Sequence, residues 1–484
     1  MSRILRNFLA SLKLVAHTCL LVPSLLATLL SLRTPHTFVL MRSLVLTIHK
    51  LSNLIRAESL INSPILFESY WSKWYFGKRA RTKILTLEAE AESVYRRCGH
   101  FDATKNFIEL TKIQTKESRQ LLGKDTLLLG PGWISAFGHL SNLSLFPKIE
   151  KLEWRKFESL LIAGSQTSNP AMLDLYKSWY KVLNFDLRTQ ITFDLYFRNS
   201  YQNMNAIEVR DSQLRDLYTA QFEIEEAIRV KFGDSFHLLE VPREVAALGK
   251  SYLESHNFDP ESWFVTLHMR ETGDIGKYKG GDDVNPRTYV DAINTILDLG
   301  GQVIRIGNSS MTSLKDLGVS SRRVLDYAKV EGKNPQLDVY FLGSCRYMIG
   351  TGSGPATFPN EFGRPVLYTN CPAIGRTFRL RGLSTPQLLR RRNSGELLSL
   401  NEMLNSPFGW NVSPSNLEIE RVPNTTTEIV AGVLEIHSLT EKAQSGFWIE
   451  PNVKCHESRI FSNWNIGVPI ADSFLSEYQE VFCG

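Results

Sequence analysis

The sequence predicts an α/β protein with two units, each built on a parallel, doubly wound sheet, and a helical extension at the N-terminus. From about residue 125 onward, short apolar runs alternate with helical stretches, which is the pattern of parallel strands joined by helices. The 484 residues are too many for one hydrophobic core. With 43% apolar and 22% charged residues, the composition is globular rather than fibrous or disordered.

The first 82 residues differ from the rest of the chain in charge. Eleven of them are basic and two are acidic, so this segment carries +9 of a total formal charge of +5, and the remainder carries −4. The segment is apolar as well as basic, which suits an anionic membrane surface better than nucleic acid. We therefore expect a membrane partner and no nucleic-acid partner.

Three stretches of this segment favour contact with a membrane. Residues 14–32 hold no formal charge and are just long enough to span a bilayer, whereas 38–49 are too short, and 70–81 mix aromatic residues with cations. We expect a peripheral or monotopic anchor, and a single transmembrane helix or a buried helical pack remains open. The six cysteines form no CxxC pair, so no zinc site is expected. They are scattered at low density, which fits a reducing compartment, and we expect the cytoplasmic face.

Residues 83–122 have helical periodicity with a break at residues 98–100. The pattern loosely resembles one helical-repeat unit, but a single unit cannot bury its own apolar face. An αα-hairpin packed on the body is the preferred interpretation.

The first α/β unit is predicted over residues 123–245. Its expected strands are 126–130, 157–164 and 190–197, and a helix with Pro170 in its first turn is expected over 169–183. A helical stretch over 210–256 is expected to bridge the two units.

The second α/β unit is predicted over residues 246–420. Apolar runs predict four strands, and periodic stretches between them predict helices over 286–300 and 335–345. The expected strands are 263–269, 301–307, 346–351 and 365–369. After about 380 the chain is basic and we expect loops, and the tail 421–484 is expected to add helices across both units.

Polar residues follow the strand 263–269 at its carboxyl end, where ligands bind in open α/β sheets. His268 and Arg270 alternate on one side of this exit, and Met269 lies on the other. The planar guanidinium of Arg270 matches a phosphate group. A purely structural pairing of Arg270 with Glu271, Asp274 or Asp282 is the alternative.

A small-residue loop follows the strand 346–351. It comprises Thr351, Gly352, Ser353 and Gly354, and Pro355 is expected to begin a helix whose N-terminus favours an anion. The loop is neither a Walker loop nor a dinucleotide fingerprint, since the required spacing is missing. Asn308, directly after the strand 301–307, joins the candidates for phosphate or donor binding.

A third polar position lies in the first unit, at Gly138-His139 after its first strand. Imidazole is suited to accept a proton from a hydroxyl nucleophile. A structural role for His139 in the loop is equally compatible with the sequence, and Glu271 and Asp274 remain candidates for the catalytic base.

These stretches resemble a known enzyme family. "LHMRETGD" resembles the HxR element of fucosyltransferase-like GT-B glycosyltransferases, and "RYMIGTGSGPATFPNEFGRPVLYTN" looks like their donor-phosphate loop and following helix. "NPRTYVDAINTILDLGGQVIRIGN" looks like a related bacterial group of surface-polysaccharide glycosyltransferases. The resemblance covers roughly residues 125–380. One departure is Asp274, which lies four residues after Arg270, whereas the family pattern places its carboxylate three residues on.

The resemblance implies two Rossmann-like domains in the GT-B arrangement and transfer of a hexosyl or fucosyl group in polysaccharide biosynthesis. The donor would be a nucleotide-sugar, and the acceptor a hydroxyl of a glycan or lipid-linked molecule. Arg270 and His268 would contact the diphosphate or sugar, and residues 351–354 would contact the phosphates. No catalytic metal and no further cofactor are expected, and "GGDD" (280–283) is not a DxD motif.

Two other functions remain open from the sequence. A sugar-nucleotide 2-epimerase would share the two-domain architecture but would act on soluble donors. A helical-repeat adaptor with a degenerate α/β body would bind no nucleotide.

Overall fold

The structure is a computed structural model that describes most of the chain after residue 124. The predicted membrane-associating segment 1–82 lies outside the described residues, as does nearly all of the predicted hairpin 83–122. The described ranges are 125–164, 166–184, 206–210, 214–271, 283–371, 381–404, 418–442 and 468–483, with isolated positions at 112, 115, 116, 119, 122, 123, 201, 202 and 204. Within them, no helix is both long and apolar enough to cross a membrane.

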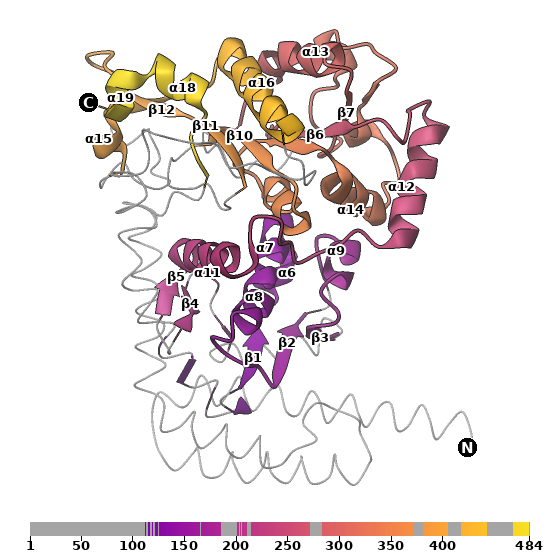
Figure 1. The fold of residues 1–484 in the computed structure, drawn as a ribbon, viewed down its shortest axis with the longest axis vertical. Helices are drawn as coiled ribbons and strands as arrows, with labels where there is room; N and C mark the ends of the chain where they lie inside the picture. The colour runs from indigo at the N-terminus through magenta and orange to yellow at the C-terminus, as the bar shows by residue number, and fades with distance from the viewer. Residues whose placement is uncertain are drawn as a thin grey trace, which may run out of the picture.

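The described chain forms two α/β units that lie one above the other (Figure 1). The first has a three-stranded parallel sheet of β1 (Thr126–Leu129), β2 (Ser159–Ala163) and β3 (Tyr180–Leu183), in that order. Its helices and its small antiparallel hairpin are α6 (Gly132–Ser135), α7 (Phe137–Ser141), η1 (Asn142–Ser144), α8 (Leu145–Lys151), α9 (Pro170–Asp174), β4 (Ala206–Glu208) and β5 (Leu214–Asp216).

The helix expected over 169–183 is wrong in its second half. Asn169 caps α9 by accepting a hydrogen bond from Met172 N (2.9 Å), and Pro170 opens the helix as expected, but the helix ends at Asp174. The aromatic and β-branched residues of "YKVL" instead form β3, where parallel pairing with β2 at the edge of the sheet outweighs local helical periodicity. The expected strand 190–197 lies outside the described residues.

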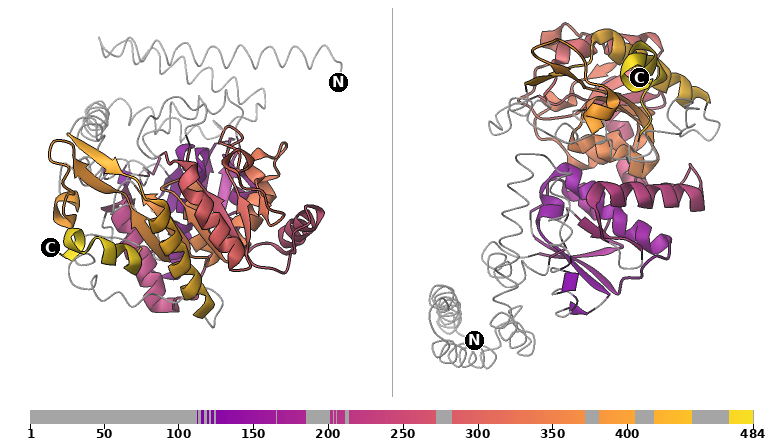
Figure 2. Two further views of the ribbon diagram at one scale, coloured as in Figure 1. Left: turned by 90° about the horizontal axis from the view of Figure 1, so that it is seen from above. Right: turned by 90° about the vertical axis from the view of Figure 1, so that its left-hand side faces the viewer.

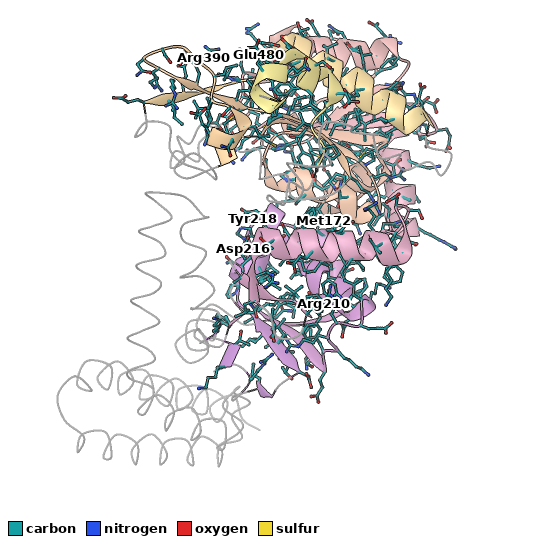
Figure 3. All side chains as sticks on the ribbon, turned by 60° about the vertical axis from the view of Figure 1, so that its left-hand side comes forward. Met172, Arg210, Asp216, Tyr218, Arg390 and Glu480 are labelled. Carbon is teal, nitrogen blue, oxygen red and sulfur yellow. The ribbon has the colours of Figure 1, made fainter. Side chains whose placement is uncertain are left out.

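Two helices connect the units, as the stretch 210–256 predicts. Asp216 caps α11 (Leu217–Phe232) by accepting hydrogen bonds from the amides of Tyr218 (3.1 Å) and Thr219 (3.2 Å), and Figure 3 labels Asp216 and Tyr218 at this end of the helix. Helix α11 lies at the junction of the units in the right-hand view of Figure 2. Helix α12 (Arg243–Ser255) packs on α14 of the second unit.

The second unit has six parallel strands in the order β11-β10-β9-β6-β7-β8. All four predicted strands are confirmed, and the sequence missed the short β8 and β11. The strands are β6 (Phe264–His268), β7 (Gln302–Arg305), β8 (Val324–Leu325), β9 (Tyr347–Gly350), β10 (Val366–Cys371) and β11 (Gly382–Pro386).

Helices cover both faces of this sheet. The predicted helices are confirmed as η4 with α13 and as α14, and α13 and α16 lie side by side in the left-hand view of Figure 2. The elements are η4 (Pro286–Tyr289), α13 (Val290–Asp298), η5 (Lys315–Leu317), η6 (Tyr327–Lys329), α14 (Pro335–Ser344), η7 (Gly354–Thr357), η8 (Pro359–Phe362), α15 (Leu400–Leu404), α16 (Thr426–Lys442), α18 (Asp472–Glu477) and α19 (Gln479–Cys483).

The basic stretch after residue 380 contains strands rather than the expected loops. Gly382 begins β11 with φ of +146°, and a side chain there would collide with the Val366 carbonyl of the neighbouring strand. The chain continues as β12 (Leu388–Arg391), which pairs antiparallel with β13 (Ile419–Val422). In the described part of the tail, α16 packs on α13, α18 and the sheet, so these helices lie on the second unit instead of across both.

Buried polar side chains join the two units. Lys148 of α8, only 3% exposed, donates hydrogen bonds to Glu225 Oε1 (2.6 Å) and to Glu361 Oε2 of the second unit (2.8 Å). Ser144 Oγ donates to the other Glu361 oxygen (2.9 Å). Buried charged groups of this kind stabilise little, but they demand one geometry, so the network fixes how the units face each other.

Candidate functional site

Two of the predicted polar clusters meet at the carboxyl edge of the six-stranded sheet. β6 and β9 are neighbours, with His268 opposite Gly350. Beyond the strand ends, Thr351 N donates to His268 O (3.3 Å) and Arg270 N donates to Thr351 Oγ1 (3.3 Å). Arg270 and the small-residue loop are therefore held side by side.

Strand β6 alternates between the two faces of its sheet, as expected. Val265, Leu267 and Met269 belong to the core beneath α13 and α16. On the opposite face, Thr266 Oγ1 donates to Phe341 O of α14 (2.6 Å). By this alternation the His268 side chain lies on the face of the sheet that α14 covers, and Met269 lies on the opposite face.

His268 is buried, with 4% of its surface exposed, and its Nδ1 has no hydrogen-bond partner among the described residues. Burial, assisted by the positive charges of Arg305 and Arg270, lowers the pKa of His268 from 6.5 to about 4. The ring is therefore neutral at pH 7. It can accept or donate a hydrogen bond to a ligand, but it supplies no charge.

The lowered pKa of His268 predicts a pH dependence of stability. Because the folded pKa lies below the unfolded value, the unfolded chain binds more protons between pH 6.5 and about 4. We expect the free energy of unfolding to fall as the pH drops through this window. Urea unfolding of wild type and of His268→Gln at several pH values tests this, since the variant should lose that part of the slope. An equal slope in both proteins would contradict it.

The Arg270 side chain is about one-third exposed, and its Nε lies 3.8 Å from Asp283 Oδ1. This carboxylate belongs to the residue after Asp282, while Asp274 and Asp282 lie outside the described residues. A long, partly exposed ion pair contributes at most about 1 kcal/mol. A phosphate group that offers two oxygens to the guanidinium could replace it.

Glu271 does not pair with Arg270. Its Oε1 accepts from Arg305 Nη2 (2.9 Å), and its Oε2 accepts from the Thr312 amide (2.9 Å) and hydroxyl (2.6 Å). Both carboxylate oxygens of Glu271 therefore already accept hydrogen bonds, one from the end of β7 and one from the loop after it. This environment favours a positioning role for Glu271 over proton transfer.

The loop Thr351–Gly354 offers donors, but no helix dipole supports it. The chain continues as the 3-10 turns η7 and η8 instead of the expected helix, because Pro359 has no amide to donate to the Pro355 carbonyl, as an α-helix would require. Thr351 is buried, and Ser353 N donates to Thr351 O (2.5 Å). Within the described chain, the amides of Gly352 and Gly354 and the Ser353 hydroxyl make no hydrogen bond.

The loop of the first unit touches this small-residue loop. A Cβ built on Gly354 would lie 2.5 Å from Gly138 N, and one built on Gly138 would lie 2.7 Å from Gly354 Cα. Only glycine at both positions allows the two backbones to approach so closely. The predicted position Gly138-His139 of the first unit is therefore next to the small-residue loop of the second.

This contact places His139 on the α7 turn beside Gly354. Its Nδ1 lies 2.8 Å from Gly132 O. Because a carbonyl oxygen only accepts hydrogen bonds, Nδ1 must carry the ring proton. A neutral His139 therefore has its lone pair on Nε2, the arrangement that a general base requires.

The paired glycines predict a strong effect of a single methyl group. We expect Gly354→Ala to separate the two loops, lower the free energy of unfolding by about 1–3 kcal/mol and reduce any activity of the site. Gly132→Ala at the start of α6, in the first unit, is the control, because a Cβ there meets nothing within 4 Å. Urea unfolding of both variants checks this, and equal stability of the two would refute the close contact.

Asn308 lies on the exposed loop after β7, and its Oδ1 accepts from Ser310 N (3.2 Å). Its neighbour Gly307 borders His268, since a Cβ on Gly307 would lie 3.7 Å from His268 Cδ2. This loop therefore adjoins the other two clusters. In the described chain, no three His, Cys, Asp or Glu side chains gather to hold a metal ion.

Sequence reasoning missed three charged residues near this edge. Arg305 is wholly buried at the end of β7, and Lys333 donates a hydrogen bond to Gly307 O. Asp338 in the first turn of α14 accepts from Asn169 Nδ2 of the first unit (2.9 Å), and burial raises its pKa to about 6. A charged residue inside an apolar run, as in "VIRIG", is the same signal that identified Arg270.

A small cavity of about 30 Å³ lies elsewhere, between α8, α11 and the segment before β11. Its lining includes Lys148, Glu225, His237 and Arg381. It contains none of the predicted site residues, and its volume suits water rather than a substrate.

No family model and no curated protein matches this chain. Among solved structures, the glycosyl transferase family 9 protein from Veillonella parvula DSM 2008 matches with 8% identity and a TM-score of 0.40, over 54% of this chain and 86% of that chain. E. coli ADP-heptose lps heptosyltransferase II gives 10% and 0.35, over 55% and 90%. E. coli heptosyltransferase WaaC with ADP gives 9% and 0.32, over 54% and 90%.

These likenesses are too loose to assign an activity to this chain. The three matched proteins are described as glycosyl transferase family 9 or heptosyltransferases, so the expected resemblance to the fucosyltransferase-like group is not confirmed.

Proposed function

We propose that this chain is a metal-independent glycosyltransferase that moves a sugar from a nucleotide-diphosphate donor to a hydroxyl of a glycan or lipid-linked acceptor. One observation carries the proposal. Arg270 lies beside a loop with unengaged donors, this loop touches Gly138 of the first unit, and the adjacent residue His139 has an available lone pair on Nε2.

In this proposal the second unit binds the donor. Arg270 and the donors of Gly352, Ser353 and Gly354 face the diphosphate. Negative charge grows on the diphosphate as its bond to the sugar breaks, and a fixed guanidinium stabilises that charge more in the transition state than in the ground state. This positive charge takes the place of a catalytic metal ion.

The first unit supplies the base. The acceptor oxygen attacks the anomeric carbon, the bond between that carbon and the diphosphate oxygen breaks, and its electron pair leaves with the nucleoside diphosphate. The acceptor proton passes to His139 Nε2, which the hydrogen bond from Nδ1 to Gly132 O prepares for this role.

The basic, apolar segment 1–82 suits an acceptor at a membrane. We propose that it holds the enzyme at an anionic membrane surface, on the cytoplasmic face, where a lipid-linked acceptor would be presented.

A ligand panel tests the function with the full-length protein. Nucleoside diphosphates and sugar nucleotides are screened by thermal shift, since a ligand that binds only the folded protein raises its melting temperature. The stabilising sugar nucleotides are then incubated with candidate acceptors, and the products are analysed. Transfer or slow hydrolysis supports the proposal, conversion of the donor sugar without an acceptor indicates an epimerase, and no nucleotide binding overturns both.

A further inference from the structure

Arg305 is an unusual residue at the end of β7, because its charged side chain is completely buried. Its Nη1 donates to Thr312 O (2.9 Å) and to Asp326 Oδ1 (3.0 Å), and its Nη2 donates to Glu271 Oε1 (2.9 Å). Glu271 follows β6 and Asp326 follows β8. One guanidinium therefore joins the carboxyl ends of three adjacent strands.

The two carboxylates also bind the loop after β7 through their second oxygens. The second oxygen of Glu271 accepts from the amide and hydroxyl of Thr312, and the second oxygen of Asp326 accepts from Leu314 N (2.9 Å). Residues 307–311 are here called the arch. The residues that follow it, Thr312 and Leu314, are bound by the carboxylates of Glu271 and Asp326, which Arg305 holds in place.

Two lysines fix the arch from another direction. Lys333 donates to Gly307 O, and Lys329 donates to Ser309 O (2.6 Å). Because the C=O and N–H of a trans peptide point in opposite directions, the bond to Gly307 O turns the Asn308 amide away from Lys333. Within the described chain that amide makes no hydrogen bond.

The arch borders the proposed donor site. Gly307 lies against His268, and Met311 packs so closely on Gly307 that a Cβ there would lie 2.4 Å from its sulfur. The His268 ring borders this arch two residues before Arg270, and its buried Nδ1 has no partner among the described residues. A shift of the arch would move the surroundings of His268.

Stability is a poor reason for such a network. Burying one cation with two carboxylates costs desolvation energy that the ion pairs only about offset, and apolar residues of similar size often serve as well. Arg305 also donates a hydrogen bond to the Thr312 carbonyl, and it fixes Glu271 and Asp326, each of which accepts a hydrogen bond from a backbone amide of the loop. The network delivers a fixed geometry, which is what a binding loop at a strand end needs.

We propose that Arg305 is a positioning residue that holds the arch and His268 in place beside Arg270 for binding of the donor diphosphate. This inference rests on the proposed function, since it concerns the same site. Arg305 itself touches no donor. It acts through Glu271, Asp326 and Thr312.

The test compares Arg305→Met with Arg323→Met. Arg323 also donates to carbonyls of this unit, at Leu297 (2.8 Å) and Gly301 (3.2 Å), but at the amino edge of the sheet. For Arg305→Met we expect the Kd for ADP, UDP, GDP or CDP, whichever the wild type binds, and the donor KM to rise about 10- to 100-fold, as for other residues that orient binding groups. We expect kcat to change less, and hydrogen exchange over residues 307–314 to accelerate. Arg323→Met should change neither affinity nor exchange there.

A milder variant keeps the test decisive if Arg305→Met does not fold. Thr312→Val removes the hydroxyl bond to Glu271 and leaves every charge paired, so it should weaken nucleotide binding in the same direction by a smaller factor. Arg305→Lys should not restore binding, because an ammonium lacks the planar fork that bridges two carboxylates. A folded Arg305→Met or Thr312→Val that binds nucleotide as the wild type does overturns the inference alone. A wild type that binds no nucleotide overturns the proposed function and this inference together.

Discussion

Replacing Arg270 with Met is expected to lower kcat for sugar transfer by about 100- to 1000-fold, the usual cost of losing one fixed donor to developing negative charge. The backbone amide of Arg270 donates to Thr351 Oγ1 (3.3 Å), which sets this residue beside the loop where the leaving diphosphate would be held. Arg270→Lys keeps the charge but not the two parallel donors, so its loss should be intermediate. Steady-state kinetics with the true donor measure both variants.

Arg346 provides the matched control for Arg270. It lies before β9 at the opposite, amino edge of the same sheet, where it stacks on Trp263 (4.9 Å) and donates to Thr440 Oγ1 (3.0 Å). Arg346→Met should lower stability and leave turnover per folded molecule unchanged. If Arg270→Met retained full turnover, or if both variants lost it equally, the assigned role of Arg270 would be wrong.

The sheet of the second unit was predictable from the sequence because its central strands are buried on both faces. "FVTLH", "VIRIG", "YMIG" and "VLYT" read as apolar runs bounded by polar residues, and each is a strand. β11 escaped prediction because "GLSTP" has little apolar character of its own, and pairing with β10 determines its structure. β3 escaped because its four residues follow a helical pattern without a clear break.

The site was predictable to the extent that parallel strands end at a common edge. The residues after β6 and β9 had to lie at that edge, and His268, Arg270 and Thr351 do. The strand order is not written in local sequence, so the direct adjacency of β6 and β9 could not be predicted. The contact of Gly138 with Gly354 depends in turn on how the two units face each other, which buried side chains such as Lys148 and Glu361 determine.

Side-chain networks were the least predictable feature. Glu271 read as a possible base because it follows the strand exit, whereas Arg305 and Thr312 engage both of its oxygens. The helix expected after Gly354 failed for a local reason that the sequence did contain, namely Pro359, which has no amide to donate to the carbonyl of residue 355.

His139→Ala is expected to lower kcat by about 100- to 10,000-fold, the range for losing a general base. The donor Kd should change little, because His139 belongs to the first unit and Arg270 to the second. Added imidazole should restore part of kcat, since a small base can occupy the space left by the ring. Single-turnover kinetics and calorimetric titration separate the two effects.

His256→Ala is the matched control for His139. The His256 ring also contacts a backbone carbonyl through Nδ1, at 2.8 Å from Tyr252 O, but it lies at the end of α12, away from Gly354. The bond from Nδ1 to a carbonyl is therefore common to both residues, whereas the contact of the Gly138 loop with Gly354 belongs to His139 alone of the two. Unchanged kcat in His139→Ala would remove it as the base. A large loss of donor affinity would instead give His139 a binding role. Because both oxygens of Glu271 already accept hydrogen bonds, Asp338, whose pKa burial raises to about 6, would then be the next candidate base to test.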